Sequence, residues 1–437
     1  MKKAKHSFLG LAKGALLLLF PLAVLAGPFV EALLVGVTDK APDAYKTGEK
    51  MKFTLSIEKI NSLPDGEWFV AWTRTGDDGK TEKGKAPAKV GKVTEVVTSL
   101  ASPGFVRLEA YLVDAAGKRV KRDKNAPGEN WFGEKDVFFD GGAAADIAKI
   151  RQGAKEPADF DAFWKRQKAE LAKVPMKVKR WEVKSPNSKV RVYGVQVDSA
   201  GGRPVTGYLS IPKRCDGGTK LGARLEFDGY GTGIQRAPKH CWFEWQINFH
   251  INAHGYDLEQ EGDYYKKFFE SIKSNGKGYA LDPVQNSDPK KAYFLGMTLR
   301  VLRALEYVKS LPEWNGRELE VSGGSQGGLQ TVWAAALDKD VTKASPQIIW
   351  CCDIGKRGQG RMRSTFEPGY TDALRYFDCV NMAKRITCAV EVPRAGLGDY
   401  VSPPSGIAVF ANNLTKAKSK KVSWVQGSRH GYVPPKK

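Results

Sequence analysis

A glycine-rich hexapeptide, Gly323-Gly324-Ser325-Gln326-Gly327-Gly328, constrains the fold more than any other feature of the chain. An apolar strand-like run at residues 319–321 precedes it, and a helix-like run at residues 329–337 follows it. A turn that joins a strand directly to a helix strains its central serine, and side chains two residues away would clash there. Glycine at both of those positions removes the clash. The pattern therefore predicts a strand–turn–helix unit that presents the Ser325 hydroxyl at the end of a sheet.

The leading segment of the chain, from Gly27 to about residue 140, alternates apolar and polar residues with a period of two. In one run Phe53, Leu55 and Ile57 alternate with polar residues, and turn residues separate successive runs. Several short strands at this spacing predict a small antiparallel, immunoglobulin-like β-sandwich. The segment contains no histidine, and no cluster of polar residues in it looks like an active site. We therefore expect an accessory domain over residues 27–145 that is separable from the chemistry, with few contacts crossing its boundary.

A joint of small residues at 140–145 ends this segment, and strands then alternate with helices. Strand-like runs cover residues 190–197, 207–211, 223–227, 319–321, 346–350 and 388–392, and helix-like runs cover residues 292–310 and 326–336. Such alternation predicts a mostly parallel sheet with helices on both faces. Together with the strand–G-x-S-x-G–helix context, it predicts an α/β-hydrolase fold over residues 146–437.

The general base can be found by elimination among five histidines: His6, His240, His250, His254 and His430. In α/β-hydrolases the catalytic residues follow the chain order serine, acid, histidine. Only His430 follows Ser325, and it lies in a loop after the apolar run at residues 422–425. The sequence therefore predicts Ser325 as nucleophile and His430 as base.

The acid of the triad must lie between the other two residues, at the end of a sheet strand. The acidic candidates are Asp338, Asp340, Asp353, Glu367, Asp372, Asp378, Glu391 and Asp399. Asp399 leaves a core strand at residues 388–392 through a glycine-containing loop, which brings it toward the loop of His430. We therefore expect Asp399 to orient His430, with Asp378 as the alternative.

Two backbone amides are the candidate oxyanion donors. Gln326 follows the nucleophile at the start of the helix, and Tyr230 lies in a glycine-containing loop, residues 228–231, directly after a strand. A second donor from the loop after an earlier strand is what the fold requires. An ordinary glycine turn is the alternative interpretation of residues 228–231.

Metal and cofactor patterns are weak in this chain. His250 and His254 are four residues apart, but the surrounding pattern is not helical and no H-E-x-x-H motif is present. The six cysteines fit no C-x-x-C zinc spacing. We therefore expect neither a metal site nor a cofactor, and we expect Cys351 and Cys352, in an apolar run, to be buried free thiols.

The first 26 residues have the pattern of a secretory signal. Lysines at positions 2, 3 and 5 precede an apolar run, which ends in small residues. An uncleaved anchor is the alternative, but Lys13 leaves the apolar run shorter than the ~20 residues that span a membrane. We expect a secreted or periplasmic protein with no membrane span after cleavage. The formal net charge is +21, yet no nucleic-acid-binding signature accompanies it, which favours a solvated basic surface over nucleic-acid binding.

These residues together resemble the acetyl xylan esterase and cephalosporin C deacetylase family of carbohydrate esterases. The resemblance covers roughly 280 residues and is carried by residues 159–164, 227–231, 252–256, 323–328, 376–378 and 396–404 and by His430. It implies cofactor-free hydrolysis of O-acetyl esters on small xylo-oligosaccharides by Ser325, Asp399 and His430, with oxyanion donors at Tyr230 and Gln326. This chain departs from the family pattern at Asp228, where histidine is frequent, and at Tyr400, where a second acid is frequent. Family members form hexameric rings, so the resemblance implies a homo-oligomer, although the shorter members lack the leading segment present here.

The expected function is therefore that of a serine esterase acting on an acetylated carbohydrate. Two alternatives stay open. One is a peptidase or longer-chain lipase on the same fold, and the other is a carbohydrate-binding protein whose hydrolase domain is inert. The product released on hydrolysis distinguishes a peptidase or lipase from an acetyl esterase. Reaction of Ser325 with an organophosphate distinguishes an active enzyme from an inert binding protein.

Overall fold

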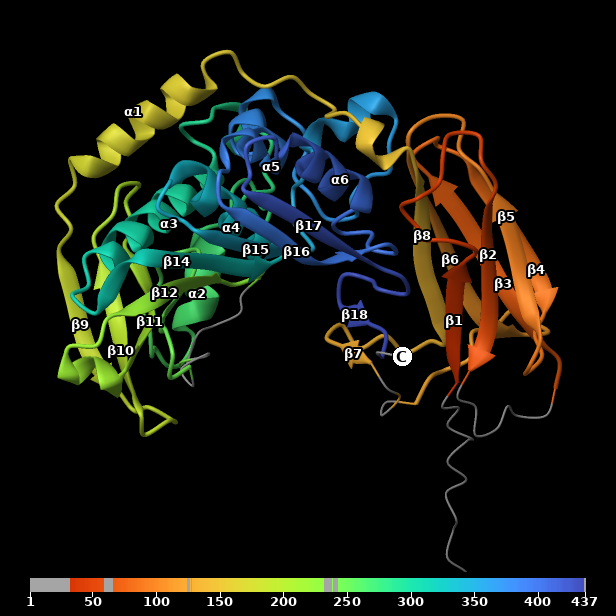
Figure 1. The fold of residues 1–437 in the computed structure, drawn as a ribbon, viewed down its shortest axis with the longest axis horizontal. Helices are drawn as coiled ribbons and strands as arrows, with labels where there is room; N and C mark the ends of the chain where they lie inside the picture. Colours follow the sequence, from red (N-terminus) through yellow and green to blue (C-terminus); the bar gives the residue numbers. More distant parts are fainter. Residues whose placement is uncertain are drawn as a thin grey trace, which may run out of the picture.

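A computed structural model describes residues 32–58, 66–123, 126, 128–231, 238 and 243–435. Figure 1 shows two bodies side by side, a smaller all-β body formed by the leading segment and a larger α/β body formed by the rest. The expected signal at residues 1–26 lies outside the described residues, as do His240 and Cys241.

The leading segment forms two antiparallel sheets that enclose one apolar core. The first sheet has the order β1 (Leu33–Thr38), β2 (Met51–Glu58), β5 (Val93–Thr98), and the second has the order β4 (Thr81–Pro87), β3 (Trp68–Gly76), β6 (Gly104–Asp114), β8 (Phe138–Ala145). Alternate residues of β2 are buried, beginning at Met51, as the period of two requires. Side chains from both sheets, such as Phe53 and Leu108, belong to the same buried cluster.

A nine-stranded, mostly parallel sheet organises the larger body. Its order is β17 (Ser419–Val425), β16 (Ala389–Gly396), β15 (Lys343–Gln347), β14 (Trp314–Gly324), β12 (Leu221–Phe227), β13 (Ile247–Ile251), β11 (Val205–Pro212), β10 (Val190–Val197), β9 (Val178–Val183). The six strands from β17 to β13 run parallel, and β11, β10 and β9 are antiparallel to their neighbours. The expected mostly parallel sheet is confirmed.

The part of this body that the structure describes has six α-helices: α1 (Phe160–Ala172), α2 (Tyr264–Ser271), α3 (Tyr293–Lys309), α4 (Gln326–Leu337), α5 (Cys379–Met382) and α6 (Pro404–Asn413). Helix α4 lies against β12, β14 and β15, and it also contacts α3 and α5. Nearly every residue of α4 is buried, so the helix after Ser325 is held on all sides. Within the described residues, no helix has the length and apolarity to cross a membrane. Cys351 and Cys352 are buried free thiols, as expected.

One expected strand is shifted. The apolar run at residues 346–350 was expected to form a strand, but β15 ends at Gln347. The backbone of Ile348 has a positive φ of 40°, which a strand cannot accommodate. The chain turns there to surround the nucleophile, and the Trp350 amide donates a hydrogen bond to the carbonyl of Ser325 at 3.1 Å.

The boundary between the two bodies is not sparse, which corrects the expectation of few contacts. Strand β7 (Glu129–Asn130), from the leading segment, pairs with β18 (Tyr432–Val433), near the end of the chain, and both lie between the bodies in Figure 1. The side chain of Gln426 exchanges two hydrogen bonds with the backbone of Gly142, at 3.0 and 2.7 Å. The leading segment is thus built into the end of the hydrolase chain.

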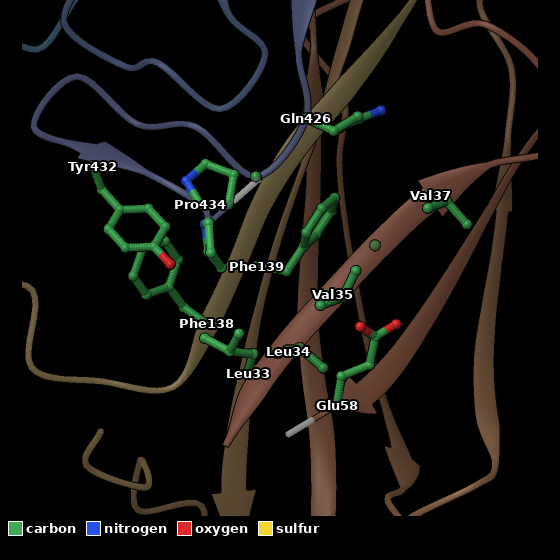
Figure 2. Close-up of a pocket in the computed structure, with 13 residues that line it drawn as sticks. Leu33, Leu34, Val35, Val37, Glu58, Phe138, Phe139, Gln426, Tyr432 and Pro434 are labelled. Atoms are coloured by element: carbon green, nitrogen blue, oxygen red, sulfur yellow. The ribbon is translucent and has the colours of Figure 1, made fainter. Parts of the chain in front are cut away.

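An apolar cavity of about 260 Å³ lies along this boundary. Figure 2 shows β1 side chains, including Leu33 and Val35, on one side of it and Tyr432 and Pro434 on the other. The rings of Phe138 and Tyr432 meet edge to face at its end, with centroids 4.9 Å apart. The two bodies therefore share apolar surface as well as hydrogen bonds.

Candidate active site

The turn around Ser325 has the geometry of a nucleophile elbow. Ser325 lies between β14 and α4 with φ 57° and ψ −117°, a conformation that non-glycine residues rarely adopt. A side chain at Gly327 would place its Cβ 2.1 Å from the carbonyl oxygen of Phe227, and one at Gly323 would place it 2.6 Å from the carbonyl carbon of Gly327. The two glycines are therefore required for β12, β14 and α4 to meet at this point.

The three expected triad residues form one hydrogen-bonded chain. His430 Nε2 lies 2.9 Å from Ser325 Oγ, and His430 Nδ1 lies 2.8 Å from Asp399 Oδ2. The other carboxylate oxygen of Asp399 accepts hydrogen bonds from the amides of Val401 and Ser402, both at 2.8 Å. An acceptor at Nδ1 fixes the tautomer that leaves Nε2 free to accept a proton from Ser325. Asp399 and His430 are buried, and Ser325 is half-buried.

Asp378, the alternative acid, lies in a different environment. Its carboxylate caps α5 and accepts hydrogen bonds from the amides of Asp353, Ile354 and Val380, at 2.8–3.1 Å. Burial and the neighbouring Asp353 carboxylate raise the pKa of Asp378 to about 7. This carboxyl group organises a loop and does not contact His430.

Both expected oxyanion donors lie beside Ser325. Tyr230 lines the same cavity as Ser325, and Gln326 is the first residue of α4. A third residue, Tyr279, connects the two: its hydroxyl accepts a hydrogen bond from the Gly231 amide at 3.0 Å and donates one to Gln326 Oε1 at 2.9 Å. Its ring stacks on that of Tyr230 with centroids 4.1 Å apart. Burial raises the pKa of Tyr279 well above its ordinary value, so the hydroxyl stays protonated and able to donate.

The nucleophile opens into a cavity of about 660 Å³, within the range typical of small-molecule sites. Its lining combines the nucleophile, the base and the Tyr230 loop with aromatic side chains and one arginine: Trp131, Phe132, Phe227, Asp228, Gly229, Tyr230, Gly324, Ser325, Gln347, Ile348, Phe366, Arg394, Val401, His430 and Gly431. Asp228, where the family often has histidine, is paired with His250 at 3.0 Å. His254 lies within 2.9 Å of the Tyr293 hydroxyl, so the two histidines of the 250–254 pair have separate partners.

Two lining residues, Trp131 and Phe132, come from the leading segment. The Trp131 amide donates a hydrogen bond to the carbonyl of Gly431 at 2.8 Å, and the rings of Phe132 and His430 lie 6.0 Å apart. This corrects the expectation that residues 27–145 are separable from the chemistry. This β-pair was not predictable from local sequence patterns, because pairing between distant segments leaves no local periodicity.

Arg429, next to His430, is the main charged link between the bodies. Its guanidinium is buried and bonds to Asp140 at 2.7 Å, Glu109 at 2.7 Å and Glu134 at 3.0 Å, all from the leading segment. Burial lowers the pKa of Arg429, but the charge of Asp140 and the hydrogen bonds to Asp140 and Tyr111 together outweigh burial and raise the pKa. The loop that carries the histidine is therefore anchored to the all-β body.

Comparisons with known proteins bear on this site. Residues 143–359 match the family model for acetyl xylan esterase. Acetyl esterase Axe7A of Xylanibacter ruminicola is 26% identical over 406 residues, which cover 90% of this chain and 85% of that protein. Coverage of this extent takes in most of the leading segment as well as the hydrolase body.

Two solved structures share the fold of the larger body. An acetyl xylan esterase from Paenibacillus sp. R4 is 25% identical with a TM-score of 0.55, over 65% of this chain and 93% of that one. Acetyl xylan esterase 1 from Thermoanaerobacterium sp. JW/SL YS485 is 19% identical with a TM-score of 0.53, over 65% of this chain and 92% of that one. The family match, the curated relative and the nearby structures agree with one another.

Proposed function

The chain belongs to the acetyl xylan esterase family and is a carboxylic ester hydrolase, and from this premise we propose that it removes O-acetyl groups from acetylated xylo-oligosaccharides or related carbohydrates. The observation that carries the proposal is the hydrogen-bonded chain from Ser325 Oγ through His430 to Asp399, which opens into a cavity of about 660 Å³. A cavity of this size accommodates a sugar as well as its acetyl group.

The proposed reaction has two acyl-transfer steps. His430 Nε2 takes the proton of Ser325 as its Oγ bonds to the acetyl carbonyl carbon, and Asp399 stabilises the imidazolium. The amides of Tyr230 and Gln326 donate to the oxyanion of the tetrahedral intermediate. The sugar oxygen leaves with the proton from His430, which forms the acetyl-enzyme. Water then gives a proton to His430, attacks the acetyl carbon and releases acetate, and Ser325 regains its proton.

Hydrolysis of a panel of substrates, each followed by the product that it would release, tests the proposal. The panel contains acetylated xylo-oligosaccharides, a long-chain ester and a peptide, and the variant is Ser325→Ala. We expect acetate from the sugars and a loss of about 10⁶ in kcat in the variant, as for removal of the nucleophile in another serine hydrolase. A preference for the peptide or the long-chain ester would favour a peptidase or lipase. A protein that an organophosphate leaves unlabelled at Ser325 would instead be an inert carbohydrate-binding protein.

Two further features belong to the same proposal. We class residues 27–145 as an immunoglobulin-like β-sandwich, supported by the facing orders β1-β2-β5 and β4-β3-β6-β8. We place the protein outside the cytoplasm, as a secreted or periplasmic enzyme, because residues 1–26 have the pattern of a signal. Determining the N-terminal residue of the mature protein tests this location.

A further inference from the structure

Two adjacent aromatic side chains stand exposed at the cavity of Ser325. Trp131 is 60% exposed and Phe132 is 62% exposed, and both line the cavity that contains Ser325 and His430. Exposing a large aromatic side chain to water is unfavourable in free energy. Two adjacent exposed aromatic side chains beside a candidate active site therefore suggest a binding surface. Neither residue comes from the hydrolase body, and the proposed reaction does not use them.

The loop that carries these rings is rigid for structural reasons of its own. Asn130 pairs with Tyr432 in the two-stranded β7–β18 sheet. The Asn130 side chain also closes the turn, because its Oδ1 accepts from the Glu134 amide at 2.8 Å and its Nδ2 donates to the Glu134 carbonyl at 3.0 Å. Gly133 supplies the left-handed conformation, with φ 65°, that the turn requires. The rings are thus held in place without being buried.

Each ring has one face covered by the histidine side of the cavity. The guanidinium of Arg394 lies over the Trp131 ring, 4.9 Å from its centroid, and Arg394 Nη2 donates to the His430 carbonyl at 3.4 Å. The Phe132 ring packs so closely on Gly431 that a Cβ there would lie 2.2 Å from it. What stays exposed on both rings is surface directed away from these contacts.

We propose that Trp131 and Phe132 form a platform on which a pyranose ring of the acetylated substrate stacks while its acetyl group reaches Ser325. The inference rests on the proposed function and names the part of the substrate that the leading segment recognises. The apolar C–H face of a pyranose packs on an aromatic ring, while its hydroxyl groups stay solvated at the rim. An acetyl group fills only a small part of the 660 Å³ cavity, so room is left for the sugar beside it.

The test compares two substrates in the full-length protein. One is an acetylated xylo-oligosaccharide and the other is ethyl acetate, which has no ring to stack. In Trp131→Ala we expect kcat/KM for the sugar ester to fall about tenfold more than kcat/KM for ethyl acetate, mainly through a higher KM. Trp131→Tyr should recover most of the loss, because it restores an aromatic face. Trp245→Ala is the matched control, since Trp245 is also 60% exposed but does not line this cavity, and it should leave both substrates unaffected.

Binding measured without hydrolysis separates this inference from the proposed function. Xylotriose is titrated calorimetrically into Ser325→Ala and into Ser325→Ala/Trp131→Ala. We expect the second protein to bind at least tenfold more weakly, and this holds even if the wild type releases no acetate from sugars. Equal binding by the two proteins would overturn the platform. Equal losses of kcat/KM on both esters in Trp131→Ala would also overturn it, because the residue would then only support His430. A smaller molecular mass of Trp131→Ala by light scattering would overturn it as well, because Trp131 would then lie in a contact between copies of the chain.

Discussion

The elbow of Ser325 and the loop of His430 are two halves of one site, but they are held in opposite ways. The elbow is a local structure, in which β14 and α4 meet through glycines and the neighbouring residues 347–350 surround the turn. The histidine loop is held from far along the chain: Arg429 bonds to Glu109, 320 positions earlier, and Tyr432 pairs with Asn130.

The difference shows where a hydrolase fold can be extended without loss of its chemistry. The nucleophile lies at the end of β14, in the centre of the sheet, where an added domain cannot be inserted without disrupting the fold. The base lies on a loop after the edge strand β17, and an added domain can reach that loop and line the cavity beside it. Substitutions in the elbow should therefore act locally, whereas substitutions in the histidine loop should also disturb its contacts with the all-β body.

Within this comparison, the largest effect is expected at the acid that orients His430. Asp399→Asn should lower kcat by about 10⁴, the loss found for the equivalent change in a well-studied protease triad, because His430 then takes the wrong tautomer. The measurement is steady-state hydrolysis of a small acetyl ester by folded protein. Asp378→Asn is the control and should do much less. If Asp378→Asn proved the more damaging to kcat, the order of the two acids would be reversed.

Next in size is the loss of the charged anchor. Arg429→Met leaves the buried carboxylate of Asp140 with one fewer partner, so the free energy of unfolding should fall by about 3–5 kcal/mol. The kcat should also fall, by roughly 10²-fold, as the neighbouring histidine shifts. Arg385→Met is the control, since Arg385 also pairs with more than one acid, here Glu156 and Asp161, but lies away from the site. A variant at 429 that lost stability but kept its kcat would show that the leading segment does not position His430.

The elbow should respond to a single methyl group. Gly327→Ala directs its Cβ against the backbone of Phe227, so the free energy of unfolding should fall by about 1–3 kcal/mol and kcat should fall with it. Gly217→Ala is the control, because nothing lies within 4 Å of a Cβ there and its φ lies outside the left-handed range that favours glycine. Denaturant unfolding measures the stability of both variants, and steady-state hydrolysis measures their kcat. If Gly327→Ala left both the free energy of unfolding and kcat unchanged, the backbone of Phe227 would not restrict the elbow as described.

The smallest expected effect is a pH dependence on the elbow side. Burial lowers the pKa of His254 well below 6.5, and its ring packs 4.5 Å from that of Tyr279, the residue that bonds to Gln326. Below pH 6.5 the unfolded chain therefore binds a proton that the native state does not. The stability from neutral His254 is fully present above that pH and is lost as the pH falls, by about 1.4 kcal/mol per unit. Unfolding of the wild type and of His254→Gln at pH 7.5 and pH 5.5 should differ by that slope, and parallel curves would contradict it.

The sequence predicted the local half of the site well. A glycine two residues to each side of Ser325, between a strand and a helix, has few other uses. The fold requires the base to follow the serine, and one histidine follows Ser325 in this sequence. Asp399 could be placed at the end of a strand, and the structure brings it within 2.8 Å of His430. The mostly parallel sheet was predictable because its strands and helices alternate along the chain.

The contribution of the leading segment could not be predicted, although part of its signal was present. Along β6 the buried residues, such as Leu108, alternate with half-buried Arg107, Glu109 and Tyr111. In a single sheet that polar face is normally solvated. Nothing in the pattern shows that Arg429 covers it, because a contact between residues 109 and 429 is set by tertiary packing and not by local periodicity. Exposed Trp131 and Phe132 likewise lie in a short strand-and-turn segment with no regular period.

The pairing of β7 with β18 also dictates the order in which the active site is completed. Synthesis supplies the all-β body well before the histidine loop, so this contact closes a long stretch of the chain. Loop closure over such distances is entropically costly and slow compared with formation of a local turn. The serine elbow can therefore form while the chain is still inactive. A product that stops before residue 429 has a nucleophile with no base, and hydrolysis begins only when the segment from Arg429 to Val433 docks onto the all-β body.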